Sequence, residues 1–273
     1  MRVIDAHLHC TGRERADDVL RTLDGAGVEV GVLLAPFLSD GYSMHDAASL
    51  RRANEHLASL VRGHEDRLVG LAVVNPALPG AADDTVRALD ELRLSGLKMV
   101  PSGWQPGDPV AQPVLAAAAQ RNAPILFHSG IFIDGRSSRF CRPADYEPVR
   151  DHPGLRVTLA HLGWPWSDEA IAVGLIDRIN GVPPRACVFR FDISFGAPPP
   201  YRMSVLRNAL EVLSADLLQF GSDCFLPCPA QQLVERRVTV ERLLDDLEVG
   251  AAERARIFDG TAAEWLGMGH AGQ

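Results

Sequence analysis

Apolar segments short enough to be single strands alternate with amphipathic segments along the whole chain. Residues 28–34 and 68–74 are apolar at almost every position, which is typical of strands buried on both faces. By contrast, residues 81–94 carry Val86, Leu89 and Leu92 at a helical spacing, which is typical of a helix packed on one face. The pattern predicts eight strands, at residues 3–9, 28–34, 68–74, 96–100, 124–128, 155–160, 186–192 and 217–221.

Helices are predicted between these strands and after the last of them. They lie at residues 17–23, 46–63, 81–94, 110–121, 143–151, 167–180 and 203–214, and then at 234–247, 251–258 and 262–266. Because no linker or low-complexity stretch interrupts the alternation, residues 1–273 read as a single domain. Eight strand–helix units in roughly 250 residues indicate an α/β fold, a closed (β/α)8 TIM barrel with extra C-terminal helices.

A doubly wound open sheet is the alternative to a barrel. It would usually carry a Gly-rich phosphate loop after its first strand, and here that place holds the sequence His-Leu-His-Cys at residues 7–10. The barrel is therefore the favoured fold.

Composition argues against nucleic-acid and membrane partners. The 27 Lys and Arg residues are outnumbered by 35 Asp and Glu residues, which gives a formal charge of -8, and no basic run is present to contact phosphates. No apolar run approaches the roughly 18 residues needed to cross a bilayer, so a cytoplasmic protein is expected. The five cysteines are an odd number in a large chain, which predicts free thiols.

Ionisable side chains stand at or near the C-terminal ends of the predicted strands. His7 and His9 are two residues apart on the first strand, so their rings point the same way and can meet one ion. Imidazole suits Zn²⁺ and similar metals. An isolated pair of this kind also occurs by chance, but barrels gather the ends of all their strands at one mouth. Strands four, five, six and eight supply the other ionisable residues, which are Lys98, His128, His161 and Asp223.

Four segments in this order resemble the amidohydrolase superfamily, and specifically its amidohydrolase-related branch, which includes aminocarboxymuconate semialdehyde decarboxylase and various lactonases and hydrolases. The segments are residues 4–9, 124–130, 159–163 and 220–223. Residues 260–266 are similar to the closing helix of that branch, with Thr261 in place of the usual Asn. The resemblance covers essentially the whole chain.

This resemblance implies a metal site and a proton-transfer residue. His7, His9, His128 and Asp223 would bind one divalent ion, with Zn²⁺ expected and Mn²⁺ as the alternative. His161 would be the catalytic base or orienting acid, and Asp223 would also shuttle a proton. Three roles stay open for Lys98, which are a carboxylated bridge to a second metal, a substrate-binding or electrostatic role, and a structural role.

The substrate is expected to be a small, carboxylated molecule. Arginines on the loop after the fifth strand could bind a carboxylate, and tryptophans after strands four and six could wall a planar group, although each could equally be a surface or packing residue. The candidates are Arg136, Arg139, Arg142, Trp104, Trp164 and Trp166.

Three functions follow from these residues. The first is metal-dependent hydrolysis of an ester, lactone or amide through a metal-activated water. The alternatives are nonoxidative decarboxylation of a small aromatic or unsaturated acid at the same site, and ligand binding without turnover. The sequence leaves a monomer and a homodimer open.

Overall fold

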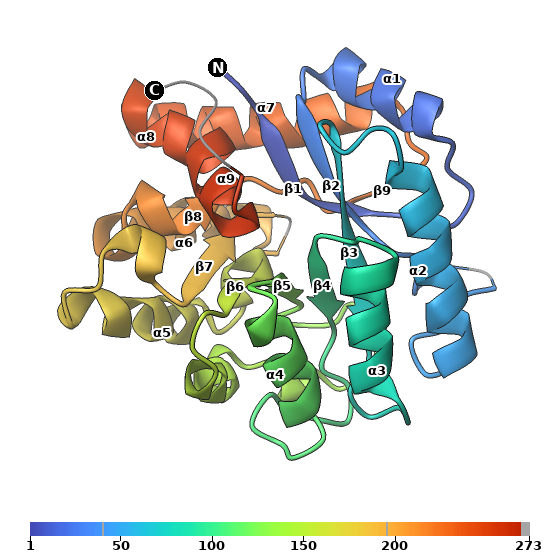
Figure 1. The fold of residues 1–273 in the computed structure, drawn as a ribbon. Coiled ribbons are helices and arrows are strands. Elements are labelled where there is room, and N and C mark those ends of the chain that lie inside the picture. Colours follow the sequence, from blue (N-terminus) through green and yellow to red (C-terminus); the bar gives the residue numbers. More distant parts are fainter. Residues whose placement is uncertain (40, 195, 269–273) are drawn as a thin grey trace.

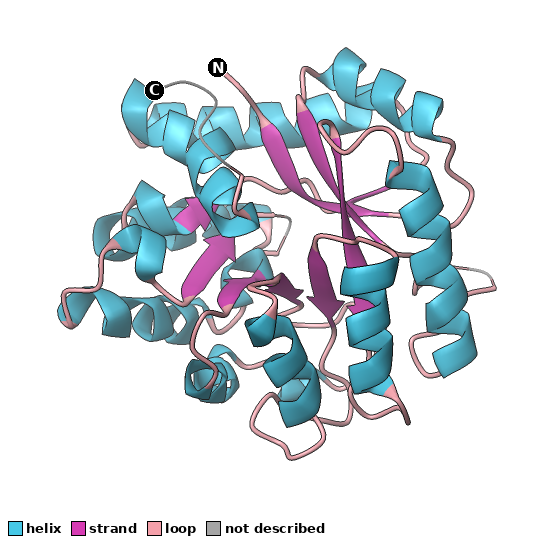
Figure 2. Ribbon diagram, viewed as in Figure 1, coloured by secondary structure: helices cyan, strands magenta, loops and turns pink. Residues whose placement is uncertain are grey.

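Parallel strands form a barrel that helices surround (Figure 1), and Figure 2 shows the alternation of strand and helix along the chain. The computed structural model of the protein describes residues 1–39, 41–194 and 196–268. Its strands lie side by side in the order β8-β7-β6-β5-β4-β3-β2-β1-β9. Their bounds are β1 Ile4–His9, β2 Val30–Leu34, β3 Leu68–Val74, β4 Gly96–Met99, β5 Pro124–Phe127, β6 Arg156–Leu159, β7 Phe189–Asp192, β8 Leu218–Gln219 and β9 Cys224–Phe225.

The last strand segment closes the barrel. β8 pairs with β7 and β9 pairs with β1, so one short stretch of chain joins the two edges of the sheet. Between β8 and β9 the backbone still bonds to β1, because the Ala6 amide donates to the Phe220 carbonyl at 3.0 Å and the Asp223 amide donates to the His7 carbonyl at 2.9 Å. The predicted barrel is thereby confirmed, but the predicted strand at 217–221 is shorter, and β9 was not predicted.

The helices largely follow the predicted alternation. Their bounds are α1 Ala16–Ala26, α2 Ala47–Val61, α3 Ala81–Val86, α4 Gln112–Gln120, α5 Ser167–Ile179, α6 Pro199–Leu213, α7 Ala230–Asp246, α8 Ala251–Ala255 and α9 Thr261–Leu266. The predicted helix at 143–151 is a 3-10 helix that contains Pro148. α6 begins at Pro199, earlier than predicted, since proline is tolerated in a first helical turn.

The C-terminal helix α9 closes the end of the barrel opposite the strand C-termini. It packs against β1, β6 and β8, and the Trp265 indole donates to the carbonyl of Arg156, the first residue of β6, at 3.0 Å. Trp265 belongs to a buried apolar cluster with residues such as Ile4, Val30 and Leu71. This end of the barrel is therefore filled, and only the end at the strand C-termini is left for chemistry.

Two expectations from composition can be compared with the structure. All five cysteines are free, as the odd number predicted. Among the described residues, no helix is long and apolar enough to span a bilayer.

Candidate active site

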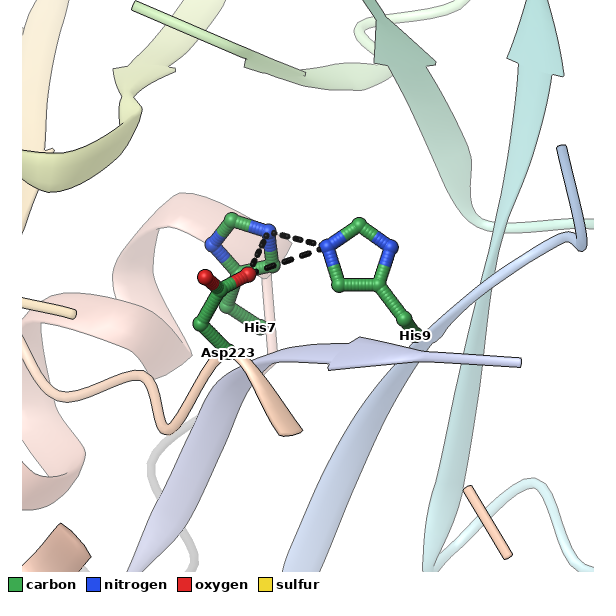
Figure 3. A group of neighbouring side chains, drawn as sticks. All are labelled: His7, His9 and Asp223. Carbon is green, nitrogen blue, oxygen red and sulfur yellow. Dashed lines mark hydrogen bonds and ion pairs between the residues drawn. The ribbon is translucent and has the colours of Figure 1, made fainter. Parts of the chain in front are cut away.

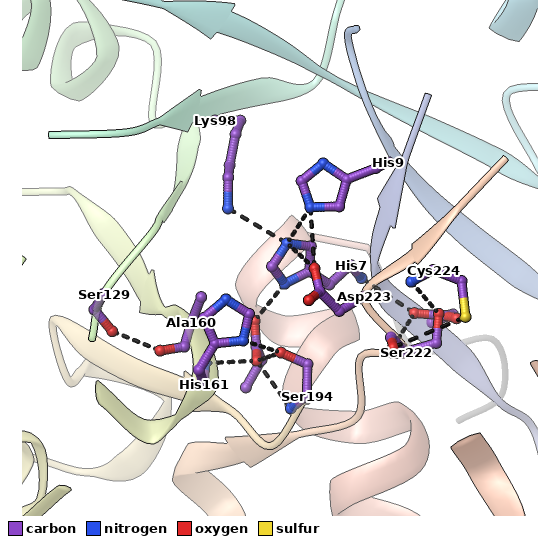
Figure 4. Close-up of polar contacts among 12 residues, drawn as sticks. His7, His9, Lys98, Ser129, Ala160, His161, Ser194, Ser222, Asp223 and Cys224 are labelled. Carbon is purple, nitrogen blue, oxygen red and sulfur yellow. Dashed lines mark hydrogen bonds and ion pairs between the residues drawn. The ribbon is translucent and has the colours of Figure 1, made fainter. Parts of the chain in front are cut away.

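A cavity of about 150 Å³ opens at the C-terminal ends of the strands. Its wall includes His9, Lys98, His128, His161 and Asp223, which come from five different strands or strand ends. Residues separated by more than two hundred positions therefore meet at one mouth, as a closed barrel requires. Figure 4 shows most of these side chains pointing toward one another.

Three side chains, His7, His9 and Asp223, form a cluster in which three possible metal-ligand atoms converge (Figure 3). The Nε2 atoms of His7 and His9 are 3.1 Å apart, and the Asp223 Oδ1 atom lies 3.3 Å from the first and 3.0 Å from the second. The register of the pairing between β1 and β2 shifts between Asp5 and Leu8, where His7 lies. Ligands at metal bond lengths of 2.0–2.2 Å are themselves separated by roughly 3.0–3.5 Å, so the spacing suits one divalent ion.

Asp192 determines which nitrogen of His7 faces the cluster. Its Oδ2 atom lies 2.8 Å from His7 Nδ1. Burial lowers the pKa of His7 to about 4, with a contribution from Lys98, so the ring is neutral at pH 7 and has one N–H group. Because Asp192 accepts that hydrogen at Nδ1, Nε2 presents a lone pair to the cluster. A carboxylate behind the ring in this way is the usual support of a metal-binding histidine.

His128 lies outside the three-donor cluster of His7, His9 and Asp223, whose ligand atoms are all within 4.8 Å of one another. Its ring stacks on Phe132 with the centroids 4.3 Å apart, and its Nε2 atom is buried without a hydrogen-bond partner. Burial, assisted by His161 and Lys98, holds the pKa of His128 well below its usual range, so the ring is neutral. A buried ring nitrogen without a partner at the wall of this cavity fits a metal ligand.

His161 is held by a short chain of hydrogen bonds. Ser194 Oγ lies 2.8 Å from His161 Nδ1 and also donates to Asp192 Oδ1. Since the hydroxyl hydrogen goes to the carboxylate, the oxygen must accept from His161, which places a hydrogen on Nδ1. Nε2 is therefore the nitrogen available for proton exchange. Asp192 thus supports both a predicted metal ligand and the predicted proton-transfer residue.

The two predicted catalytic residues have left-handed backbone conformations, with φ 61° at His161 and φ 57° at Asp223. Such angles are uncommon outside glycine and persist where the surroundings hold them. At His161, the backbone amide donates to Asp192 Oδ1 at 2.9 Å, and Gly196 passes so close that a Cβ there would lie 2.5 Å from the His161 Cβ. The surroundings thus hold the 161–162 turn in place.

Two carboxylates in the site stay ionised despite their burial. Burial alone would raise the pKa of Asp192 and of Asp223, but His7 and the hydrogen-bonded side chains around each outweigh it and hold both pKa values below their usual range. Asp223 can therefore act as an anionic ligand, and Asp192 as an acceptor.

Lys98 is buried in β4, with 1% of its surface exposed, and its Nζ atom lies 3.4 Å from His7 Nε2. Burial lowers its pKa to about 8, although Asp192 and Asp223 act in the opposite direction. The lysine thus reaches the cluster itself. This position is compatible with a bridging role and with a role in binding substrate charge.

The sequence matches the Amidohydrolase family over residues 4–268. The chain belongs to this family. No curated protein sequence matches the chain.

Several solved structures have the same fold as this amidohydrolase. The 5-carboxyvanillate decarboxylase LigW from Sphingomonas paucimobilis is 19% identical over 98% of this chain and 99% of its own, with a TM-score of 0.67. A 2,6-dihydroxybenzoate decarboxylase in complex with 2,6-dihydroxybenzoate is 15% identical over 98% and 100%, with a TM-score of 0.70. The dihydroxybenzoic acid decarboxylase from Polaromonas sp. JS666, with bound manganese and 2-nitroresorcinol, is 16% identical over 99% and 98%, with a TM-score of 0.64. Identities this low show a shared fold alone.

The predicted substrate residues of the amidohydrolase are divided between the cavity and the rest of the protein. Arg136 and Trp164 line the cavity. Trp104 does not belong to its wall among the described residues, and with 1% exposure it packs in the core. Arg139 is exposed and its guanidinium lies over the Phe140 ring at 4.5 Å. Trp104 was placed by its loop position, which does not reveal that the side chain turns inward.

Two residues of the site in this amidohydrolase were missed by the sequence reasoning. Asp192 stands at the C-terminal end of the seventh predicted strand, so the rule that selected His128 and His161 could have selected it as well. Ser194 carries no comparable signal, because serines after strands are common in turns and caps. Its role is visible only from its contacts with His161 and Asp192.

His9 is a proposed metal ligand, so His9→Ala is expected to reduce metal affinity by at least about 100-fold. This loss is larger than the loss caused by removing a residue that only supports a ligand. His128→Ala is expected to reduce it as well, since this histidine lines the same cavity with an unpartnered Nε2 atom. Metal content after dialysis, measured by mass spectrometry, tests both. His152→Ala is the matched control, because this histidine bonds to Gln112 outside the cavity. Full metal content in His128→Ala would remove His128 from the ligand set.

Proposed function

We propose that this amidohydrolase catalyses the metal-dependent nonoxidative decarboxylation of a small aromatic carboxylic acid. The observation that best supports this proposal is that aromatic rings stack directly on two of the histidines proposed as metal ligands. Phe225 lies against His9 with centroids 4.5 Å apart and planes inclined by 8°, and Phe132 lies against His128 with planes inclined by 10°. Both phenylalanines line the cavity with Phe37. Walls of this kind suit a flat ring placed next to a metal.

Hydrolysis of an ester, lactone or amide is the reaction that the family resemblance put first. The decarboxylases among the structures similar to this chain support the alternative instead. The cations of the cavity also support it, because Lys98 and Arg136 can attract a carboxylate. Arg136 is held over the Phe132 ring at 4.1 Å and is paired with Asp134 at 2.7 Å, so it is positioned at the mouth.

The proposed roles follow from the contacts of the site. A divalent ion held by His7, His9, Asp223 and His128 would supply positive charge that polarises the oxygens of the acid. His161, fixed through Nδ1 by Ser194, donates a proton from Nε2 to the ring carbon that carries the carboxylate. The bond from that carbon to the carboxylate then breaks, its electron pair returns to the ring, and CO₂ leaves. His161 regains a proton from solvent.

Matched substrate panels test this proposal. Protein loaded with Mn²⁺ or Zn²⁺ is incubated with hydroxybenzoates and, separately, with aryl esters, lactones and anilides of the same size. Release of CO₂ with formation of the corresponding phenol, abolished by a chelator, is the expected result. Hydrolysis of the esters, lactones or anilides without any CO₂ release would contradict the proposal and restore the hydrolytic function.

Replacing Lys98 with methionine separates its proposed roles. If the lysine binds substrate charge, as we expect from its place on the cavity wall, the variant keeps one metal per chain and KM for the acid rises at least tenfold, the usual loss for a buried charge-assisted bond. The measurements are metal content and steady-state kinetics. Wild-type protein with two metals and a variant with one would show a bridging lysine instead.

A further inference from the structure

Exposed apolar side chains gather at the mouth of the cavity that holds the proposed metal site. Among the described residues, nine large apolar side chains are exposed to solvent, and four of them line this one cavity. Single exposed apolar residues are ordinary on a protein surface, but several around one opening mark a site that meets an apolar partner. The four residues, which we call the apolar rim, are Leu38, Ile131, Ile133 and Phe225.

The apolar rim comes from three separate segments of the chain. Leu38 follows β2, Ile131 and Ile133 follow β5, and Phe225 is the last residue of β9. β9 and β2 both lie next to β1, whereas β5 stands three strands away from β2, so the rim borders the mouth from more than one side. A chemical group that leaves the cavity between these segments therefore meets apolar surface on both sides.

Hydrogen bonds hold the rim segment that follows β5. The Ile131 amide donates to the Trp164 carbonyl at 2.9 Å, and the Phe132 amide donates to Ser138 Oγ at 2.8 Å. Phe132 is buried, and its ring stacks on His128. The isoleucines on either side of it line the mouth and stay exposed, one of them with 93% of its surface in contact with solvent. Their apolar surface is therefore available to a ligand.

The volume of the cavity limits how much of a ligand it can enclose. About 150 Å³ is space for a single benzene-sized ring, and it is less than the roughly 300–1,000 Å³ of pockets that enclose larger organic ligands. A ring whose carboxylate is drawn to Lys98 and the proposed metal site would fill this space. Any group attached to the far side of the ring would then lie at the mouth, among the side chains of the apolar rim.

We propose that the apolar rim binds an uncharged, apolar substituent of an aromatic acid, such as an alkyl chain opposite the carboxylate. A charged or strongly polar substituent would lose water against these side chains without gaining a hydrogen bond, whereas an alkyl chain covers them and is covered itself. Acids that carry such a chain are then the preferred substrates. Their role as substrates rests on the function proposed above, but their binding does not.

Calorimetric titration of the metal-loaded protein with benzoate, 4-propylbenzoate and 4-pentylbenzoate tests the proposal. We expect one site per chain, and each added methylene should strengthen binding by about twofold to fourfold, the upper value corresponding to full burial of the group. In a double variant, Leu38→Gln with Ile133→Gln, this gain should fall to about 1.5-fold or less, because the chain then meets polar side chains. Benzoate itself, which does not reach the rim, should bind equally to both proteins.

Ile179→Gln is the matched control. Ile179 is also an exposed isoleucine, but it ends α5 and lies outside the described wall of the cavity, so its replacement should leave the gain per methylene unchanged. An equal gain in the wild type and the double variant, or no gain in the wild type, would overturn the proposal. A dimer that dissociates in the double variant would also overturn it, since the apolar rim would then be an interface between two copies of the chain.

The test of the apolar rim does not depend on turnover. If hydroxybenzoates release no CO₂ while alkyl chains strengthen binding, the proposed function fails and the role of the rim stands. If hydroxybenzoates release CO₂ while alkyl chains add nothing to binding, only the role of the rim fails.

Discussion

Replacing His161 with asparagine lowers the rate of decarboxylation by about a thousandfold, within the range for loss of a proton-transfer group, while the metal content stays at the wild-type value. Asparagine is the informative substitution, because it tolerates the left-handed backbone at this position better than alanine does. The loss can then be assigned to the imidazole and not to a collapsed turn. Steady-state kinetics and metal analysis on the same sample measure it.

His152→Asn is the matched control for this substitution, since its ring bonds to the Gln112 side chain away from the cavity. Its kcat should equal that of the wild type. If His161→Asn retained most of the activity, proton delivery would have to come from another residue. If it lost metal as well, His161 would be a ligand and our assignment of roles would be wrong.

Replacing Asp192 with asparagine is expected to reduce metal affinity by about tenfold to 100-fold. In the part of the chain that the structure describes, three hydrogen-bond donors meet Asp192 Oδ1, namely the His161 amide at 2.9 Å, the Ser194 amide at 3.0 Å and the Ser194 hydroxyl. Among the same residues, Oδ2 meets His7 Nδ1 alone. The amide oxygen of asparagine should therefore stay with the three donors, and its NH₂ group should face His7. His7 must then carry its hydrogen on Nε2, where the metal needs a lone pair.

Ser194→Ala complements the Asp192→Asn substitution, because it is expected to lower activity without lowering metal affinity. It leaves the bond between Asp192 and His7 in place but removes the hydroxyl that accepts from His161. We expect wild-type metal affinity together with a lower kcat and an altered dependence of kcat on pH, because His161 loses the group that sets its tautomer. Equal losses of metal in Asp192→Asn and Ser194→Ala would contradict our assignment, in which Asp192 orients the metal ligand His7 and Ser194 orients His161.

Much of the barrel was predictable from the sequence. Continuous apolar runs such as residues 28–34 and 68–74 specify buried parallel strands, and the observed β2 and β3 lie within them. Short elements were predicted less well, because two-residue strands such as β9 carry no periodic signal. β9 exists because Asp223 turns the chain and the following residues bond to β1.

The candidate site was also predictable as a set of residues. His7, His9, Lys98, His128, His161 and Asp223 all stand at or near strand ends, and in a closed parallel barrel those ends share one mouth. The structure brings His9, Lys98, His128, His161 and Asp223 to one cavity, with His7 in direct contact with His9 and Asp223. Their roles as ligands and as a proton donor stay predictions that the variants above address.

By itself, the sequence determined the class of fold and the list of reactive side chains, because strand periodicity and strand ends are local properties of the chain. Only the tertiary structure decided which of those side chains support one another. Asp192 joins His7 to Ser194 and His161 through close approaches between β1, β7 and the turn after β6, such as that of Gly196 to His161. These distances depend on how the barrel closes, which no short stretch of sequence specifies.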